Sequence, residues 1–145
     1  MTLYMGIDPG YSGAVAVVDE KGALVALQRL NGTEHDISSF MLGRQLTVEL
    51  AILEKVSSMP RQGVASTFKF GTSYGFCRGL LVCHRIPFET ATPVTWQRSL
   101  KCLSKGDKNV TKAAAQRLWP QEKVVHATAD AMLIAEYARR LAAQR

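Results

Sequence analysis

The sequence predicts an α/β fold, in which a mixed β-sheet carries helices on its faces, and three observations lead to this prediction. Three short apolar runs separated by turn signals come first. Strand-like apolar runs and helical patterns then alternate up to the C-terminus. The 145 residues are 47% hydrophobic and 21% charged and include no linker or low-complexity tract, so we expect a single domain over residues 1–145.

The first thirty residues predict a β-meander. Strands are expected at residues 3–7, 14–18 and 23–30, because each run is apolar and a turn sequence, DPGYSG or DEKG, separates it from the next. The stretch GIDPGYSGAVAV places one carboxylate, Asp8, at the end of the first apolar strand. After the third strand, Asp36 is expected to cap a short helix that continues to about residue 42.

The middle of the chain predicts a buried strand and a glycine-rich helix. VELAILEKV is short and mostly apolar, which is typical of a buried strand, and Glu54 lies near its C-terminal end. In the next segment Gly71, Gly75 and Gly79 recur every four residues and therefore fall on one face of a helix. Such a face suits a binding surface that another backbone approaches closely, or a tightly packed internal helix, and the spacing leaves both open.

The C-terminal third predicts one further strand and three helices. IPFETAT is the strand, and Thr92 followed by Pro93 opens a helix through VTWQRSLKCL. SKGDKN is expected to be a loop, and the helix over residues 110–119 ends at Pro120. HATADAMLIAEYARRLAAQR closes the chain as an amphipathic helix with two arginines in its last turns.

Composition limits the classes of function. The net charge of +6 favours an anionic partner such as nucleic acid. The chain does not open with a charged segment followed by an apolar run, and no stretch approaches the roughly 18 apolar residues of a membrane span, so we expect a soluble cytoplasmic protein. Cys77, Cys83 and Cys102 have apolar neighbours and no CxxC spacing, which predicts buried, reduced thiols without a metal.

Acidic residues recur at the ends of the predicted elements. Asp8 ends the first strand and Glu54 the fourth, and His126 and Asp130 lie one turn apart on the last helix, which places their β-carbons about 5–6 Å apart. Three carboxylates and an imidazole in one place would repel one another unless cations lay between them, and this donor set suits Mg²⁺ or Mn²⁺. Two such ions about 3.5–4 Å apart are a known device for phosphodiester hydrolysis.

Each of these residues also has a purely structural explanation. Asp8 could cap the DPGYSG turn, Glu54 could end a strand at the surface, and His126 and Asp130 could occupy the exposed first turn of a helix. For any one residue this explanation is favoured. Two carboxylates flanked by apolar strand residues are harder to explain together, because burying an unpaired carboxylate is costly, and the metal site and the structural explanation both remain open.

Four stretches of the sequence resemble the RuvC-type Holliday-junction resolvases of bacteria and their phages, within the RNase H-like superfamily. GIDPGYSGAV is similar to the family's first strand and turn, and AILEKVSSMPRQGVASTFKFGTSYGFCRGLL to its acidic strand and following helix. TPVTWQRSLKCLSKGDK resembles its central basic segment, and ADAMLIAEYARR its final acidic helix. A lone GIDPG also opens actin-like and sugar-kinase ATPase domains, but followed by LEKV, FGTSYG and ADAMLIAEY it is much more specific.

The resemblance implies an RNase H-like fold, with a mixed five-stranded sheet flanked by helices on both faces. It also implies a homodimeric crossover junction endodeoxyribonuclease that makes paired, symmetric nicks in four-way DNA junctions with two Mg²⁺ or Mn²⁺ ions in each active site. By position, Asp8, Glu54 and Asp130 match three of the family's metal-binding carboxylates. Most relatives carry a carboxylate where His126 stands, and since imidazole ligates Mn²⁺ better than Mg²⁺, we expect a preference for Mn²⁺. The alternative for His126 is a hydrogen bond to Asp130.

Basic residues acquire roles from the same resemblance. Lys101, Lys105 and Lys108 cluster in KCLSKGDK, and Lys108 matches in position a lysine that the family uses near the scissile phosphate, where its charge would stabilise the transition state. The first two are expected to bind DNA. A solvated loop is the structural alternative for all three.

A mixture of cations and aromatic rings precedes this cluster and suits binding of phosphates and of a base at an opened junction. The cations are Arg61, Lys69 and Arg78, and the rings are Phe68, Phe70, Tyr74 and Phe76. Rings at such spacing are usually core residues, so most should be buried, with Phe68 or Phe70 the better candidate for DNA. The glycine face with its apolar neighbours is a candidate for the dimer interface, because a two-fold symmetric substrate calls for two symmetric active sites.

Three other functions were compared with that of a junction resolvase. An actin-like ATPase generally needs two lobes, and 145 residues leave room for one. A junction-binding protein without cleavage would keep the basic surface and lose a carboxylate, whereas three are present here. A nuclease of the same fold that acts on a broader range of branched DNA remains an alternative.

Overall fold

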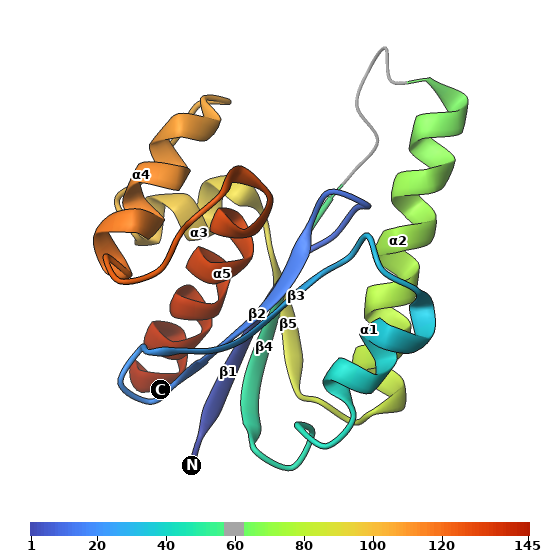
Figure 1. Cartoon of the computed structure of the whole chain (residues 1–145), viewed down its shortest axis with the longest axis horizontal. Coiled ribbons are helices and arrows are strands. Elements are labelled where there is room, and N and C mark those ends of the chain that lie inside the picture. Colours follow the sequence, from blue (N-terminus) through green and yellow to red (C-terminus); the bar gives the residue numbers. More distant parts are fainter. Residues whose placement is uncertain (57–62) are drawn as a thin grey trace.

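The five strands form one mixed sheet in the computed structural model, which describes residues 1–56 and 63–145 (Figure 1). The sheet order is β3-β2-β1-β4-β5. The strands are β1 (Leu3–Asp8), β2 (Ala14–Asp19), β3 (Leu24–Arg29), β4 (Val48–Glu54) and β5 (Phe88–Ala91). β1, β2 and β3 form the expected antiparallel meander, whereas β4 and β5 run parallel to β1. The C-terminal ends of β1, β4 and β5 therefore lie at the same edge of the sheet.

Five helices cover the two faces of the sheet, which confirms the predicted α/β class. They are α1 (Glu34–Met41), α2 (Val64–Cys83), α3 (Pro93–Ser99), α4 (Lys108–Leu118) and α5 (His126–Ala143). In Figure 1, α1 and α2 lie on one side of the sheet, and α3, α4 and α5 lie on the other. Each side has its own buried apolar cluster, because strand side chains alternate between the two faces.

Helices α1, α3 and α4 each begin after a short polar side chain that caps them, whereas α2 and α5 have no side-chain cap. Thr92 caps α3 and Pro93 is its first residue, as expected. Asp107 caps α4, which therefore begins at Lys108, two residues earlier than predicted and inside the stretch SKGDKN that was expected to be a loop. The predicted cap of α1 by Asp36 is wrong: Thr33 is the N-cap, and its hydroxyl accepts the Asp36 N–H at 3.1 Å. Since a cap side chain bonds to the second or third residue after it, Asp36 lies inside the first turn that Thr33 begins.

Helix α5 packs directly on the central strand β1, and Gly6 makes this possible. A Cβ at Gly6 would lie 2.2 Å from the backbone nitrogen of Ala135 and 2.4 Å from the carbonyl oxygen of Ala131, which no side chain tolerates. Nine residues of α5 are buried, so the helix forms the centre of its layer. This contact places the N-terminal turn of α5 beside the C-terminal end of β1.

Helix α2 runs beyond the end of the sheet (Figure 1), and among residues 1–56 and 63–145 nothing packs against its glycine face. Nothing lies within 4 Å of a Cβ built at Gly71, Gly75 or Gly79. The alternative of a tightly packed internal helix is therefore wrong. Cys83, at the end of α2, is exposed, contrary to the prediction of buried thiols, whereas Cys77 and Cys102 are buried as expected. Across the described ranges, no helix combines the length and the apolar character needed to cross a membrane.

Candidate metal and nucleic-acid site

Asp8 and Glu54 lie side by side at the C-terminal edge of the sheet. Ile7 of β1 pairs with Leu53 of β4 in parallel register, so the next residue of each strand carries its carboxyl group to the same place. The two carboxyl groups are close enough for the charge of Glu54 to raise the pKa of Asp8. The strand ends hold both residues firmly, because Glu54 is 8% exposed and its neighbours in β4 are buried.

Asp130 completes a group of three carboxylates from the facing helix. It lies in the second turn of α5, close enough to Asp8 and Glu54 to raise the pKa of both. The nearby Thr111 of α4 and the charges of Lys108 and His126 lower the pKa of Asp130, against the larger effect of burial. His126 is the exposed first residue of α5 and stands one turn before Asp130, as the sequence predicts.

Burial and mutual repulsion favour the protonated form of these carboxyls. Burial raises the pKa of Glu54 to about 7, against the hydrogen bond from Trp96, which lowers it. Burial also raises the pKa of Asp8 well above its usual range, and the charges of Glu54 and Asp130 add to this effect. Burial likewise raises the pKa of Asp130. A cation among the three would relieve the repulsion that these shifts reflect.

Trp96 holds Glu54 from the side of α3. Its side chain is fully buried, and its indole Nε1–H donates to Glu54 Oε2 at 2.8 Å. An indole can donate but cannot accept, so this bond favours the ionised carboxylate and fixes the orientation of the carboxyl group.

A cavity of about 210 Å³ opens over the carboxylates. Its lining residues are Asp8, Ser12, Lys108, Thr111, His126, Ala127 and Asp130. Within residues 1–56 and 63–145, no three His, Cys, Asp or Glu side chains already stand in the arrangement of a metal site. The donor set nevertheless fits Mg²⁺ or Mn²⁺ chemically, because it offers carboxylate oxygens and one imidazole.

The loop between α3 and α4 presents two further lysines. Lys101 and Lys105 are exposed and have positive φ angles of 59° and 52°, a conformation that favours glycine. Gln97 of α3 holds this loop, since its Oε1 accepts hydrogen bonds from the backbone nitrogen and the hydroxyl of Ser104, both at 3.1 Å. The loop leads directly to Lys108, which lines the carboxylate cavity.

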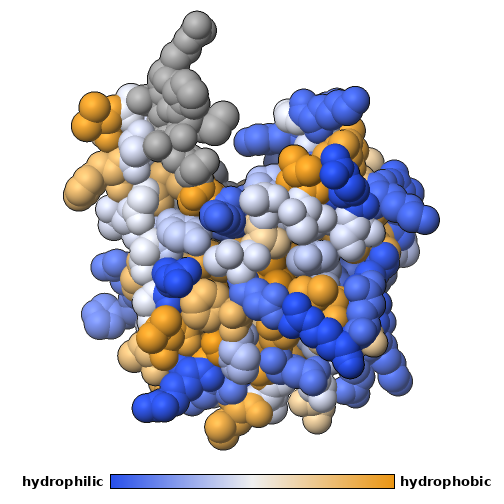
Figure 2. Space-filling model, turned by 180° about the vertical axis from the view of Figure 1, so that it is seen from behind, coloured by the Kyte–Doolittle hydropathy of each residue, from blue (hydrophilic) through white to orange (hydrophobic). Residues whose placement is uncertain are grey.

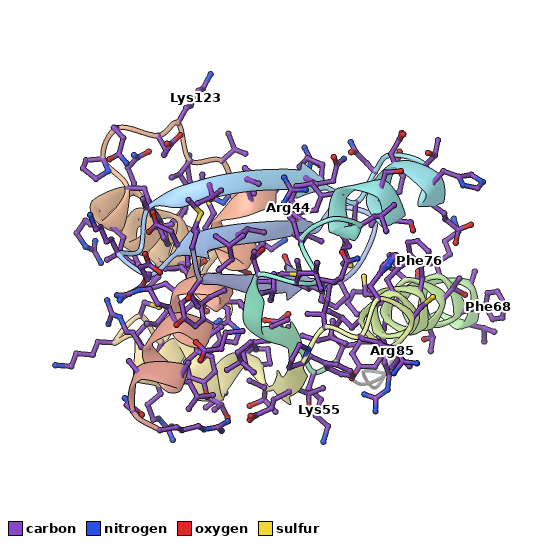
Figure 3. All side chains as sticks on the ribbon, turned by 90° about the horizontal axis from the view of Figure 1, so that it is seen from below. Arg44, Lys55, Phe68, Phe76, Arg85 and Lys123 are labelled. Atoms are coloured by element: carbon purple, nitrogen blue, oxygen red, sulfur yellow. The ribbon has the colours of Figure 1, made fainter. Side chains whose placement is uncertain are left out.

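A larger groove of about 740 Å³ lies beside this cavity, between α2 and the turn after β1. Phe68, Lys69 and Phe70 line it, together with Ser12, which also borders the carboxylate cavity. Phe68 is 75% exposed and stands on the outer side of α2, whereas Phe76 lies on the side that faces α1 (Figure 3). Figure 2 shows apolar side chains at the free end of α2 and hydrophilic ones over α4, with a hollow between these two regions.

One predicted DNA-binding arginine, Arg78, is not brought to this site, and another lies outside the described residues. The Arg78 guanidinium lies 5.3 Å from the ring centroid of Phe88, which begins β5 at the edge of the sheet opposite the carboxylates. Arg61 lies outside the described residues. Tyr74 and Phe76 pack partly buried against the apolar cluster of the α1 and α2 face. The prediction that most of the four rings would be buried is wrong, because Phe68 is exposed and the other three are half-buried.

The structure adds site residues that the sequence did not single out. Trp96 contacts Glu54, Thr111 contacts Asp130, and Ser12 borders both cavities. Trp96 and Thr111 face inward on their helices, so their sequence signal is that of ordinary core positions. Only Ser12, in the DPGYSG turn that follows a candidate ligand, carried a local signal.

Comparisons with known proteins support the fold. No family model matches the chain, and no curated protein matches it either. The structure is similar to that of T. thermophilus RuvC in complex with a Holliday junction substrate, with a TM-score of 0.64 and 17% identity over 97% of this chain and 96% of that chain. It is also similar to another Thermus thermophilus RuvC structure, with a TM-score of 0.61 and 18% identity over 97% of both chains. The chain therefore has the RNase H-like fold of RuvC.

Proposed function

We propose that this protein is a metal-dependent endodeoxyribonuclease of the RuvC type, which resolves four-way DNA junctions by paired, symmetric nicks. We place it in the cytoplasm of a bacterial cell or a phage-infected host. The observation that carries the proposal is the convergence of Asp8, Glu54 and Asp130 from two strands and a helix beside a cavity bordered by Lys108. Three carboxylates with raised pKa values at one point need a cation, and two-metal sites of this kind hydrolyse phosphodiesters.

The residues of the site would divide the chemistry among them. Asp8, Glu54 and Asp130 would hold Mg²⁺ or Mn²⁺, with His126 as a further ligand. When bound, two such ions would supply an activated water and stabilise the leaving oxygen. Lys108 is exposed at the start of α4 and lines the cavity, so its ammonium group can neutralise charge on the scissile phosphate.

The surfaces on either side of the cavity suit a nucleic acid. Lys101 and Lys105 lie on the loop between α3 and α4. Phe68, Lys69 and Phe70 lie along the groove beside α2. Lysines bind the phosphate backbone without reading sequence, and exposed rings stack on unpaired bases. A DNA strand crossing the turn at Ser12 would touch both surfaces, since Ser12 borders the groove beside α2 and the carboxylate cavity.

The exposed face of α2 supports the homodimer that paired nicking calls for. Val82 is 63% exposed on this helix, and among the described residues nothing lies against the glycine row Gly71, Gly75 and Gly79. Small residues in a row let a second helix approach closely, and a two-fold pair would carry two equivalent sites. Sedimentation equilibrium is expected to give a dimer that Gly75→Arg dissociates, and a monomeric wild type would contradict this part of the proposal.

The test is cleavage of a labelled immobile four-way junction beside a three-way branch and a linear duplex, with Mg²⁺ or Mn²⁺. Paired nicks in the junction are expected from the wild type and from Asp36→Asn, an exposed carboxylate on α1, and are expected to vanish in Asp8→Asn while junction binding persists. Equal cutting of all branched substrates would indicate a broader branched-DNA nuclease. Junction binding without cutting under either metal would indicate a non-cleaving junction-binding protein.

A further inference from the structure

We propose that Trp96 and Gln97, neighbouring residues on α3, are the positioning residues of the site: Trp96 fixes Glu54 for the metal, and Gln97 fixes the lysine-bearing loop for the DNA. This inference rests on the proposed function and adds α3 as the element that connects the metal site with the DNA-binding loop. Successive residues of a helix point about 100° apart, so one short helix can support two different groups at once. The two roles are separable by mutation.

The contact between Trp96 and Glu54 is built into the core. Trp96 is fully buried and Glu54 is 8% exposed, and the 2.8 Å hydrogen bond between them lies out of contact with solvent. The indole N–H can only donate a hydrogen bond. If the ring rotated away from Glu54, this donor would be left unpaired in the core. Groups that orient a metal ligand in this way typically change metal affinity by about 10–100-fold when they are removed.

Gln97 is the start of a chain of hydrogen bonds that ends at α4. It is 8% exposed, its side-chain oxygen accepts two bonds from Ser104, and its backbone oxygen accepts the Cys102 N–H at 2.9 Å. Ser104 in turn accepts the N–H groups of Gly106, on its hydroxyl, and of Asp107, on its carbonyl. Asp107 is the N-cap of α4, so these bonds run from Gln97 to the helix that begins with Lys108.

The loop needs such support because its backbone is strained. Lys101 and Lys105 both have positive φ, at 59° and 52°, where a side chain is disfavoured. Without the bonds to Gln97, both residues could relax to ordinary conformations and their side chains would change direction. Since lysines bind phosphates as positioned charges, the consequence would be weaker DNA binding without any change at the carboxylates.

The first experiment needs no variant at the site. The chain has two tryptophans, so its spectrum has two indole N–H resonances, and Trp119→Phe assigns them. Trp119 is a matched control, because its buried indole also donates at 2.8 Å, to the backbone oxygen of Gly22 far from the carboxylates. Titration of the wild type with MgCl₂ is expected to shift the Trp96 resonance and leave Trp119 unchanged. Saturating Mg²⁺ binding without a Trp96 shift would overturn the role of Trp96.

The second experiment separates the two residues. Trp96→Phe is expected to weaken Mn²⁺ binding, measured by calorimetry, by about tenfold or more, while Trp119→Phe leaves it unchanged. Gln97→Met is expected to weaken junction binding in EDTA and to lower the slope of log K against log salt by up to about 1, since it removes the bonds to Ser104 beside Lys105 but keeps the backbone bond from Cys102 beside Lys101. Its control is Gln116→Met, because Gln116 holds the loop that follows α4 in the same manner.

The crossed results decide the inference. Trp96→Phe should leave junction binding in EDTA unchanged, and Gln97→Met should leave Mn²⁺ binding unchanged. If either variant lowered both affinities, or neither, α3 would have no separable positioning role and the inference would be wrong. If both separate effects appear while the wild type cuts no DNA, the positioning roles stand and the proposed nuclease function fails.

Discussion

The strongest consequence of the site is that Glu54 should destabilise the metal-free protein at neutral pH and above. Its pKa rises from 4.5 to about 7 on folding. Between these values the folded protein keeps a proton that the unfolded chain has released, so the free energy of unfolding falls as the pH rises through this window. Each pKa unit corresponds to about 1.4 kcal/mol, and the loss is therefore about 3 kcal/mol, complete above pH 7.

Replacing Glu54 by Gln tests this value directly. The amide oxygen of Gln can still accept the Trp96 N–H, but the side chain has no charge to desolvate. In EDTA at pH 8, urea denaturation is expected to give Glu54→Gln a free energy of unfolding about 3 kcal/mol above that of the wild type. At pH 4.5 the two proteins should be nearly equal, because Glu54 is then largely protonated when folded.

Bound metal should make the wild type more stable than Glu54→Gln. An ion that binds only the folded protein adds about 2.7 kcal/mol of stability at one hundred times its dissociation constant. Mn²⁺ is therefore expected to stabilise the wild type at pH 8 and to stabilise Glu54→Gln much less. Equal unfolding free energies of the two proteins at both pH values in EDTA would refute the idea that Glu54 is held, desolvated, against Asp8 and Asp130.

Four further predictions follow from the same contacts. Gly6→Ala should cost about 1–3 kcal/mol or more, by forcing a Cβ into α5, and thermal unfolding followed by circular dichroism measures this loss. Lys108→Ala should lower single-turnover cleavage about 100-fold with little change in junction affinity, and an unchanged rate would remove it from the chemistry. His126→Asp should shift activity from Mn²⁺ toward Mg²⁺, and equal rates with both ions in both proteins would contradict this. Lys101→Gly should stabilise by about 1 kcal/mol, since the positive φ then carries no penalty, and should weaken DNA binding; a stabilised protein with full affinity would show that this lysine does not contact DNA.

Local sequence carried most of the information about the elements. The meander, the buried fourth strand, the Pro93 helix start and the long last helix all depend on short-range patterns that act within one turn or one strand. The prediction that Asp36 caps α1 was wrong because Thr33 and Asp36 have similar capping strength and lie three positions apart. Only the backbone shows that Thr33 precedes the first turn. The prediction that Cys83 is buried was wrong because apolar neighbours in the sequence do not reveal which helix face is covered.

The candidate site was half visible in the sequence. Asp8 and Glu54 each end an apolar strand, and their pairing follows once β1 and β4 are parallel neighbours. Asp130 needed the contact of α5 with Gly6, which joins residues more than a hundred positions apart. Arg78 looked like part of a basic and aromatic patch, yet it lies over Phe88 at the start of β5, because α2 is 20 residues long and Arg78 lies in its C-terminal part.

The sequence by itself determined which residues form strands and helices, that carboxylates end two of the strands, and that the chain is basic. These properties depend on periodicity, capping and charge, which are local or additive along the chain. Only the tertiary structure decided that Trp96 would hold Glu54, that Gln97 would hold the lysine loop, and that the glycine face of α2 would be left open. These contacts join distant segments through packing, and no local pattern records which partner a buried side chain will meet.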